Sequence, residues 1–166
     1  TASDTITTLT LSNYAASTIT SNVLGTVNLT GAATASGALQ LNITAADASV
    51  RATTLNLNMA GGSVGAITGT QADLYTTVNV ASAAATTIAD QSFAAATTLN
   101  VSGAAVTTFT ANTGLAAATS INSTGAGLTL GTALANTAAF AGGAGVETIT
   151  VGATTQTITM GGGNDT

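Results

Sequence analysis

The sequence predicts an all-β protein, a parallel β-helix or β-solenoid that continues into a glycine-rich β-roll at its C-terminal end. Two observations support this prediction: apolar and polar residues alternate within short blocks, and the blocks recur along the 166 residues. In the block "TTLNVSG" (97–103), Leu99 and Val101 fall on one side and Asn100 falls on the other. Alternation of this kind is typical of a β-strand with one buried face.

The blocks recur at an interval of about 22 residues, which is the length of a structural repeat. They are "TTLTLSN" (7–13), "GTVNLTG" (25–31), "TTLNLNM" (53–59), "TTVNVAS" (76–82), "TTLNVSG" (97–103) and "ATSINST" (118–124). Their first apolar residues are Leu9, Val27, Leu55, Val78, Leu99 and Ile121, at separations of 18, 28, 23, 21 and 22 residues. The interval from Val27 to Leu55 is the irregular one. Such a repeat indicates a solenoid in which each repeat forms one coil.

Shorter strand-like segments lie between the blocks, and they indicate two or three strands in each coil. They include "STITSNV" (17–23), "AITGTQA" (66–72) and "AVTTFTA" (105–111). Coils stacked at about 4.8 Å would bury columns of apolar side chains. We expect equivalent inward positions for one such column, namely Leu55, Val78, Leu99 and Ile121. The alternative is an antiparallel sandwich, which also shows short strands at even spacing, but near-identical blocks favour stacking.

Asparagine recurs at one position of the repeat, as Asn56, Asn79, Asn100 and Asn122. Stacked coils would place these side chains in one column on the outer face. Amides in such a column can hydrogen-bond from coil to coil and form a ladder. The alternative is an ordinary polar outer face.

The chain carries almost no charge, with Arg51 as its single basic residue and a net charge of −5. One basic residue cannot neutralise a row of phosphates, so we expect no binding to nucleic acid or to an anionic membrane. The sequence has no His and no Cys, so the usual general bases, thiol nucleophiles and zinc ligands are missing. We therefore expect no enzymatic activity from this chain.

No apolar run approaches the roughly 18 residues of a membrane-spanning helix, so we expect no membrane insertion. The first residues also lack the basic and apolar regions of a signal peptide. The sequence stops within a glycine-rich motif, "GGGNDT" (161–166). We expect it to be part of a longer protein.

The end of the sequence can be written in nines, as "GGAGVETIT" (142–150), "VGATTQTIT" (151–159) and "MGGGNDT" (160–166). Position six holds Glu147, Gln156 and Asp165, and position eight holds Ile149 and Ile158. This pattern matches the nonapeptide G-G-x-G-x-D-x-U-x, which winds a β-roll and binds calcium. The candidate calcium-binding residues are Gly142, Gly143, Ala144, Gly145, Glu147, Gly161, Gly162, Gly163 and Asp165.

These residue types suit a calcium ion. Glycine adopts positive φ and lets backbone carbonyls turn toward an ion, and carboxylates supply the hard oxygen ligands that Ca²⁺ prefers. One turn of a β-roll takes two nonapeptides, so loop 142–147 should stack against loop 160–165, which comes 18 residues later. We expect calcium between the loops, held by Glu147, Asp165 and backbone carbonyls. Gln156 replaces the acid in the middle motif, so its side of the roll should bind metal poorly. The alternative is a glycine-rich turn with incidental acids.

Two segments, "LTLGTALANTAAFAGGAGVETITVGATTQTITMGGGNDT" (128–166) and "TTLNVSGAAVTTFTANT" (97–113), resemble the RTX-type surface-layer (S-layer) proteins of Gram-negative bacteria. The resemblance is closest over the second half, although Glu147 stands where the motif usually has Asp. It implies a structural protein that leaves the cell by type I secretion and assembles with copies of itself into a lattice on the cell surface when calcium is present. Residues 1–140 would form a β-solenoid segment and residues 141–166 the start of a calcium-binding RTX β-roll. Contacts with cell-surface polysaccharide would come from other regions.

Three further acids, Asp47, Asp73 and Asp90, lie between strand blocks at expected coil corners. Aspartate commonly caps turns at such places, and the alternative is an additional calcium site on the edge of the solenoid.

A second function for the chain is a Thr-rich β-solenoid adhesin or ice-binding module, because Thr-x-Thr triplets occur at 8–10, 18–20, 148–150 and 157–159. Those triplets do not recur at one coil position, which favours the surface-layer interpretation.

Overall fold

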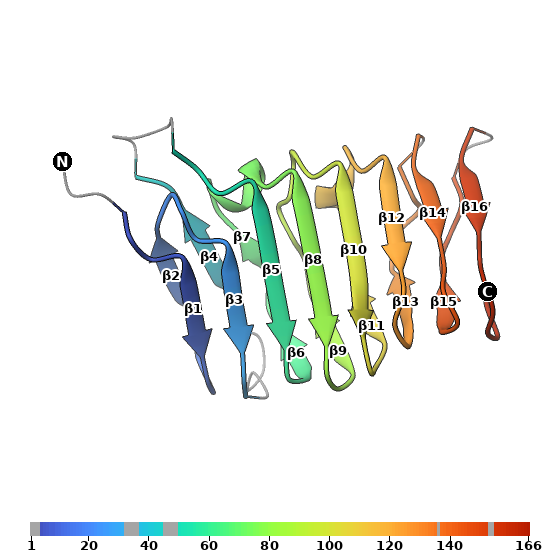
Figure 1. The fold of residues 1–166 in the computed structure, drawn as a ribbon, viewed down its shortest axis with the longest axis horizontal. Coiled ribbons are helices and arrows are strands. Elements are labelled where there is room, and N and C mark those ends of the chain that lie inside the picture. Colours follow the sequence, from blue (N-terminus) through green and yellow to red (C-terminus); the bar gives the residue numbers. More distant parts are fainter. Residues whose placement is uncertain (1–3, 32–36, 45–49, 136, 153–154) are drawn as a thin grey trace.

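The computed structural model describes residues 4–31, 37–44, 50–135, 137–152 and 155–166. Over these ranges the chain winds as a β-solenoid in which the strands of each sheet pair in parallel. The coils lie side by side along the long axis, from the N-terminal end to the C-terminal end (Figure 1). The predicted fold class is therefore confirmed, and the antiparallel sandwich is excluded.

One wall of the solenoid is an eight-stranded sheet, in which neighbouring strands belong to consecutive coils. Its strands are β1 (Thr8–Leu11), β3 (Thr26–Leu29), β5 (Thr54–Met59), β8 (Thr77–Ser82), β10 (Thr98–Gly103), β12 (Ser120–Ser123), β14 (Ala139–Ala141) and β16 (Thr157–Thr159). The six predicted blocks supply the first six of these strands. The sheet continues without a break past residue 140, because β14 pairs with β12 on one side and with β16 on the other.

The remaining strands form two smaller sheets. In the N-terminal coils they are β2 (Ser17–Thr20), β4 (Leu39–Asn42) and β7 (Ile67–Thr68). In the later coils they are β6 (Gly62–Val64), β9 (Thr86–Ile88), β11 (Thr107–Phe109), β13 (Gly127–Leu130) and β15 (Val146–Thr148). Two short 3₁₀ turns, η1 (Ala72–Leu74) and η2 (Thr113–Leu115), occupy corners of the coils.

The core is a set of apolar columns that run along the solenoid axis. Leu55, Val78, Leu99 and Ile121 stack in register on consecutive strands, and at most 2% of each is exposed. The predicted equivalence of these four positions is confirmed. Each buried side chain of this size stabilises the fold by about 1.5–3 kcal/mol.

The first two coils pair with a shift of two residues relative to the block alignment. Val27 stacks on Leu57 rather than on Leu55, and Leu9 stacks on Val27. The shift falls in the long interval between residues 27 and 55. Because side chains alternate with a period of two, a two-residue shift keeps the apolar residues inside.

The predicted asparagine ladder is present on the outer face of the eight-stranded sheet. The side-chain amides of Asn79, Asn100 and Asn122 each donate to the carbonyl oxygen of the asparagine on the preceding coil at 2.8 Å. A second, shorter ladder runs beside it, in which Asn58 donates to Asn28 at 2.7 Å. Such ladders hold consecutive strands in register and help a long sheet to stay flat.

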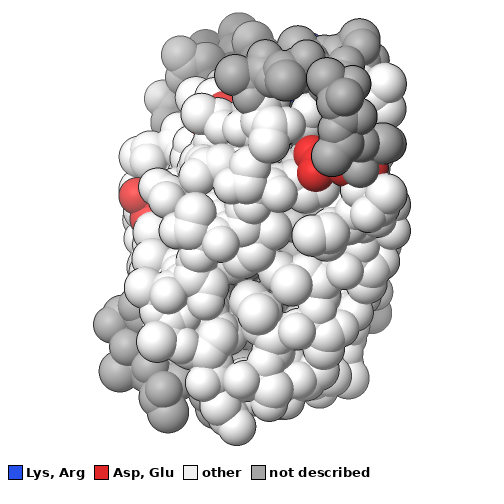
Figure 2. All heavy atoms as spheres, turned by 90° about the vertical axis from the view of Figure 1, so that its left-hand side faces the viewer, with Lys and Arg blue, Asp and Glu red and all other residues white. Residues whose placement is uncertain are grey.

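The low charge of the sequence is visible on the surface. Figure 2 shows the N-terminal end of the molecule, where a few acidic atoms lie among uncharged residues. None of the helical turns in the described residues is long and apolar enough to cross a membrane.

Candidate functional site

The two glycine-rich loops lie on consecutive coils at the C-terminal end of the solenoid. Loop 142–147 follows β14 and includes the first two residues of β15, and loop 160–165 follows β16. The backbone N–H of Gly142 donates to the carbonyl of Thr159 at 2.7 Å, and that of Gly162 donates to Gly143 at 2.7 Å. At the far side of the loops, Thr166 donates to Glu147 at 2.9 Å. The loops therefore stack with the 18-residue interval that the sequence predicts.

Close approach of the two backbones explains two of the glycines. Gly163 has a φ of 130°, and a β-carbon there would overlap the carbonyl oxygen of Gly145. Gly161 has a φ of 86°, and a β-carbon there would overlap the carbonyl of Gly143. Both positions need glycine, because other residues rarely adopt this conformation. The two loop backbones therefore pack too closely to accept a side chain at either position.

Glu147 points into the solenoid from β15 and is fully buried. The same column holds Thr86, Thr107 and Leu128 on the preceding coils, so the carboxyl group of Glu147 ends a column that mixes threonine and leucine side chains. The hydroxyl of Ser123 donates to Oε1 at 2.9 Å. Gly142 leaves space for the other oxygen, since a β-carbon there would lie 3.1 Å from Oε2.

Oε2 of Glu147 is buried and has no hydrogen-bond partner among the described residues. Loss of contact with water raises the pKa of this carboxyl above its ordinary value, and the neighbouring Asp165 raises it further. The Ser123 hydroxyl and the backbone N–H of Gly143 act in the opposite direction. An unpaired buried carboxylate oxygen is costly, so this site favours either a proton or a cation.

Asp165 approaches Glu147 from the next coil. Its Oδ1 accepts a hydrogen bond from the backbone N–H of Glu147 at 3.0 Å. The described residues hold no group of three or more acidic, His or Cys side chains suited to a metal. A calcium ion would therefore need backbone carbonyl oxygens beside these two carboxylates, which is a donor set of the kind that Ca²⁺ accepts.

The residues present fit a calcium ion in two respects. Two carboxyl groups from stacked loops lie close enough for Asp165 to raise the pKa of Glu147, and one carboxylate oxygen is buried without a hydrogen-bond partner among the described residues. The candidate carbonyl donors belong to the loops that contain Gly142, Gly143, Ala144, Gly145, Gly161, Gly162 and Gly163.

The middle motif makes a different contact. The side-chain amide of Gln156 donates to the carbonyls of Leu134 and Ala135 at 2.9 and 2.8 Å. Its oxygen accepts a hydrogen bond from the backbone N–H of Gly152 at 3.2 Å. The amide therefore occupies two backbone carbonyl oxygens that could otherwise bind a metal ion, and weak metal binding on this side stays a prediction.

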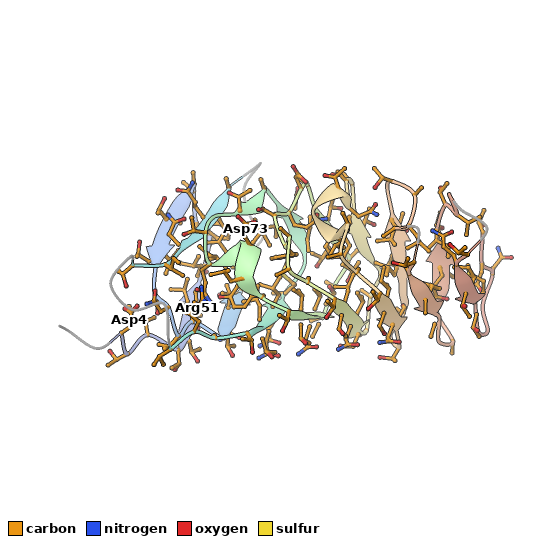
Figure 3. The ribbon with its side chains drawn as sticks, turned by 90° about the horizontal axis from the view of Figure 1, so that it is seen from above. Asp4, Arg51 and Asp73 are labelled. Atoms are coloured by element: carbon orange, nitrogen blue, oxygen red, sulfur yellow. The ribbon has the colours of Figure 1, made fainter. Side chains whose placement is uncertain are left out.

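The other acids lie apart from this pair. Asp73 Oδ1 accepts a hydrogen bond from the Ser92 hydroxyl, and Asp90 Oδ1 accepts one from the backbone N–H of Gln91 at 2.8 Å. The contact of Asp73 joins two residues that lie 19 apart in the sequence, and the contact of Asp90 is local. Figure 3 shows Asp73 on the wall of the solenoid, with Asp4 and Arg51 nearer the N-terminal end. Asp47, the third candidate, lies outside the described residues.

Sequence reasoning missed Ser123, the hydroxyl that contacts Glu147. It occupies the column of Val80 and Val101, so a polar residue at an inward position was the available signal. The sequence also contains one G-x-S-x-G pattern, at 61–65. Ser63 lies on the exposed side of strand β6, not at a strand-to-helix turn, and the chain has no His to act as its base.

No protein-family model matches the chain, and no curated protein is similar enough to count as a relative.

Proposed function

We propose that this chain is a β-solenoid segment of a calcium-dependent surface-layer protein of the RTX type, which assembles with copies of itself outside a Gram-negative cell. One observation carries the proposal. Two glycine-rich loops stack on consecutive coils, and each brings one carboxyl group, Glu147 or Asp165, to the same place.

Glu147 and Asp165 would hold the ion together with backbone carbonyls of the two loops. Calcium would supply the positive charge that the site lacks. The buried Oε2 of Glu147 would gain a partner, and the repulsion between the two carboxylates would be relieved. Ser123 and the N–H of Glu147 already fix the orientation of both side chains.

Calcium would then act as the signal for folding at this end of the chain. The residues from 142 onward include few large apolar side chains, and of these Val146 and Val151 are exposed. Ordering a backbone costs about 1–2 kcal/mol per residue, so metal binding would contribute much of the free energy that folds the loops. The segment would stay exportable where calcium is scarce and would fold outside the cell.

A structural role also agrees with the low charge of the chain, because an uncharged surface opposes self-association only weakly. Secretion by a type I system and attachment to cell-surface polysaccharide would depend on other regions of the protein. Enzymatic activity is not part of this proposal.

Electron microscopy of the whole secreted protein tests the proposal. We expect ordered two-dimensional sheets at millimolar calcium and dispersed particles after chelation. Particles that remain separate at high concentrations of both protein and calcium would contradict the lattice. Sheets that persist in chelator would contradict calcium dependence but not the formation of a lattice.

A further inference from the structure

Strand β12 belongs to the coil before the two glycine-rich loops (Figure 1), and its last residue, Ser123, contacts Glu147. Only 1% of Ser123 is exposed, so its hydroxyl lies inside the solenoid. The hydroxyl donates to Oε1 of Glu147 at 2.9 Å and so joins the eight-stranded to the five-stranded sheet. One of the two carboxyl groups proposed to bind calcium is therefore held by a residue outside both loops.

The fold alone does not require a serine at this position. Ser123 continues a column that holds Leu57, Val80 and Val101 on the three preceding coils. These three side chains are buried. A valine at position 123 would suit the strand, because β-branched residues are favoured there, and it would bury more apolar surface than serine. The serine is best explained by the carboxyl group that it contacts.

The preceding coil holds an apolar pair in the same two columns. Val101 precedes Ser123 in one column, and Leu128 precedes Glu147 in the other. Both apolar side chains are buried. Replacing two hydrogen-bonded partners by apolar groups of similar shape is often neutral or stabilising. The fold can therefore be built without the serine and the glutamate, and together they indicate a ligand.

The end of the serine column accommodates the carboxyl group. Asn122 pairs with Ala141, so Gly142 takes the place that follows Ser123 in the column. A β-carbon at Gly142 would lie 3.1 Å from Oε2 of Glu147, so glycine leaves this part of the interior to the carboxyl group. Oε1 has the Ser123 hydroxyl as its partner, whereas Oε2 is buried without a hydrogen-bond partner among the described residues.

We propose that Ser123 is a positioning residue of the calcium site, which therefore extends one coil beyond the glycine-rich loops. The inference rests on the proposed binding of calcium by Glu147 and Asp165. By holding Oε1, the hydroxyl would keep the Glu147 side chain in one orientation before an ion binds. Without it, calcium binding would have to order the side chain, which costs rotamer freedom. Partners of metal ligands typically contribute about 10–100-fold in affinity.

Two substitutions of nearly the same shape separate the hydroxyl from the packing. Ser123→Val and Ser123→Thr both introduce a β-branched side chain, but threonine keeps the hydroxyl. Calorimetric titration with calcium measures the dissociation constants of the parent chain and of both variants. We expect Ser123→Val to raise the dissociation constant about 10–100-fold, and Ser123→Thr to bind nearly as tightly as the parent. If Ser123→Val does not fold, Ser123→Ala takes its place.

A double variant tests whether the fold itself needs the polar pair. Ser123→Val combined with Glu147→Leu copies the residues of the preceding coil. We expect it to melt above the parent in chelator, because it no longer buries a carboxylate oxygen without a partner. A lower melting temperature would mean that the pair serves the fold, and it would overturn the proposal.

A second hydroxyl contact provides the control for general loosening of the solenoid. Ser82 and Thr107 lie with their hydroxyl oxygens 2.7 Å apart, inside the solenoid and two coils earlier. Ser82→Ala should leave the calcium dissociation constant unchanged. A loss of affinity equal to that of Ser123→Val would overturn the proposal, as would equal losses in Ser123→Val and Ser123→Thr.

The same titration distinguishes failure of this inference from failure of the proposed function. A parent chain that binds calcium, with a Ser123→Val variant that binds it equally well, would overturn the role of Ser123 and leave calcium binding by the loops intact. A parent chain that shows no binding at millimolar calcium would overturn both.

Discussion

Replacing Glu147 by glutamine should stabilise the chain in chelator and should remove the stabilisation that calcium gives to the parent. The substitution keeps the shape of the side chain and a group that can accept the hydrogen bond from Ser123. It removes the buried negative charge beside Asp165. In chelator at neutral pH we expect the variant to be more stable than the parent, because the parent buries a carboxylate oxygen that has no partner.

The size of both effects follows from the structure. A buried polar group without a partner costs about 1–3 kcal/mol, and more when it is charged. Glutamine keeps a polar group at this place and removes the charge, so we expect a gain of about 1–3 kcal/mol for Glu147→Gln in chelator. A site with the affinity of an extracellular calcium module has a dissociation constant of about 0.1–1 mM. At about 10 mM calcium, such a site would stabilise the parent by about 1.4–2.7 kcal/mol. In a chain of this length, each kcal/mol shifts the melting temperature by about 2–4 °C.

The pH dependence of the parent has a defined sign. The folded chain raises the pKa of Glu147 above its ordinary value of 4.5, so above that pH the folded state binds more protons than the unfolded state. The stability contributed by this group is therefore present at low pH and is lost as pH rises through the folded pKa. With calcium bound, the parent should no longer lose stability as pH rises through this range. The Glu147→Gln variant should not lose it under either condition, because glutamine does not titrate.

Thermal unfolding followed by circular dichroism, with calcium and with chelator, measures all of these effects. Magnesium at the same concentration controls for ionic strength. A variant that is less stable than the parent in chelator, and that still gains several degrees with calcium, would refute the reasoning. The carboxylate would then be satisfied within the fold, and the ion would bind elsewhere.

The remaining predictions concern the solenoid itself. Leu99→Ala should lower the free energy of unfolding by about 2–5 kcal/mol in denaturant titrations, whereas outward Thr98→Ala should change it by less than about 1 kcal/mol; equal effects would place Leu99 outside the core. Asn100→Ala removes one donated and one accepted ladder bond and should cost about 1–3 kcal/mol; no measurable change would mean that the ladder does not stabilise the fold. Gly103→Ala should cost about 1–3 kcal/mol, because φ is 115° and the new β-carbon would overlap Ser82. Gly162→Ala is the control, since no atom lies within 4 Å of its β-carbon position, and a similar loss there would contradict the steric argument.

The sequence was sufficient to predict the parts of the fold that repeat. The column that contains Leu55 and Leu99, the asparagine ladder and the stacking of the two glycine loops all depend on residues that recur at a fixed interval. In these places each coil specifies the same inward and outward faces, and neighbouring coils can pair in only a few registers. Because the same pattern recurs on each coil, it indicates which strands are neighbours and in which register they pair, which a single sequence usually does not show.

Other features could not be predicted from the sequence because they depend on non-repeating contacts. Val27 pairs with Leu57, and a shift of two residues leaves the alternation of faces unchanged. The second wall divides into a three-stranded and a five-stranded sheet, whose strands of two to four residues are too short to identify their neighbours. The contact between Ser123 and Glu147 joins two different sheets, so no periodicity within one strand indicates it.

Hydrogen exchange of the chain with calcium and with chelator tests the central claim most directly. The account predicts that chelation speeds the exchange of amides in 142–149 and 160–166, among them Gly142, Gly162 and Thr166, whose hydrogen bonds join the two loops. The amides of β8 and β10 should stay protected in both conditions, because the apolar columns hold those strands. Exchange in 142–149 and 160–166 that is the same with calcium and with chelator would mean that the glycines form a metal-free turn, and it would contradict the account.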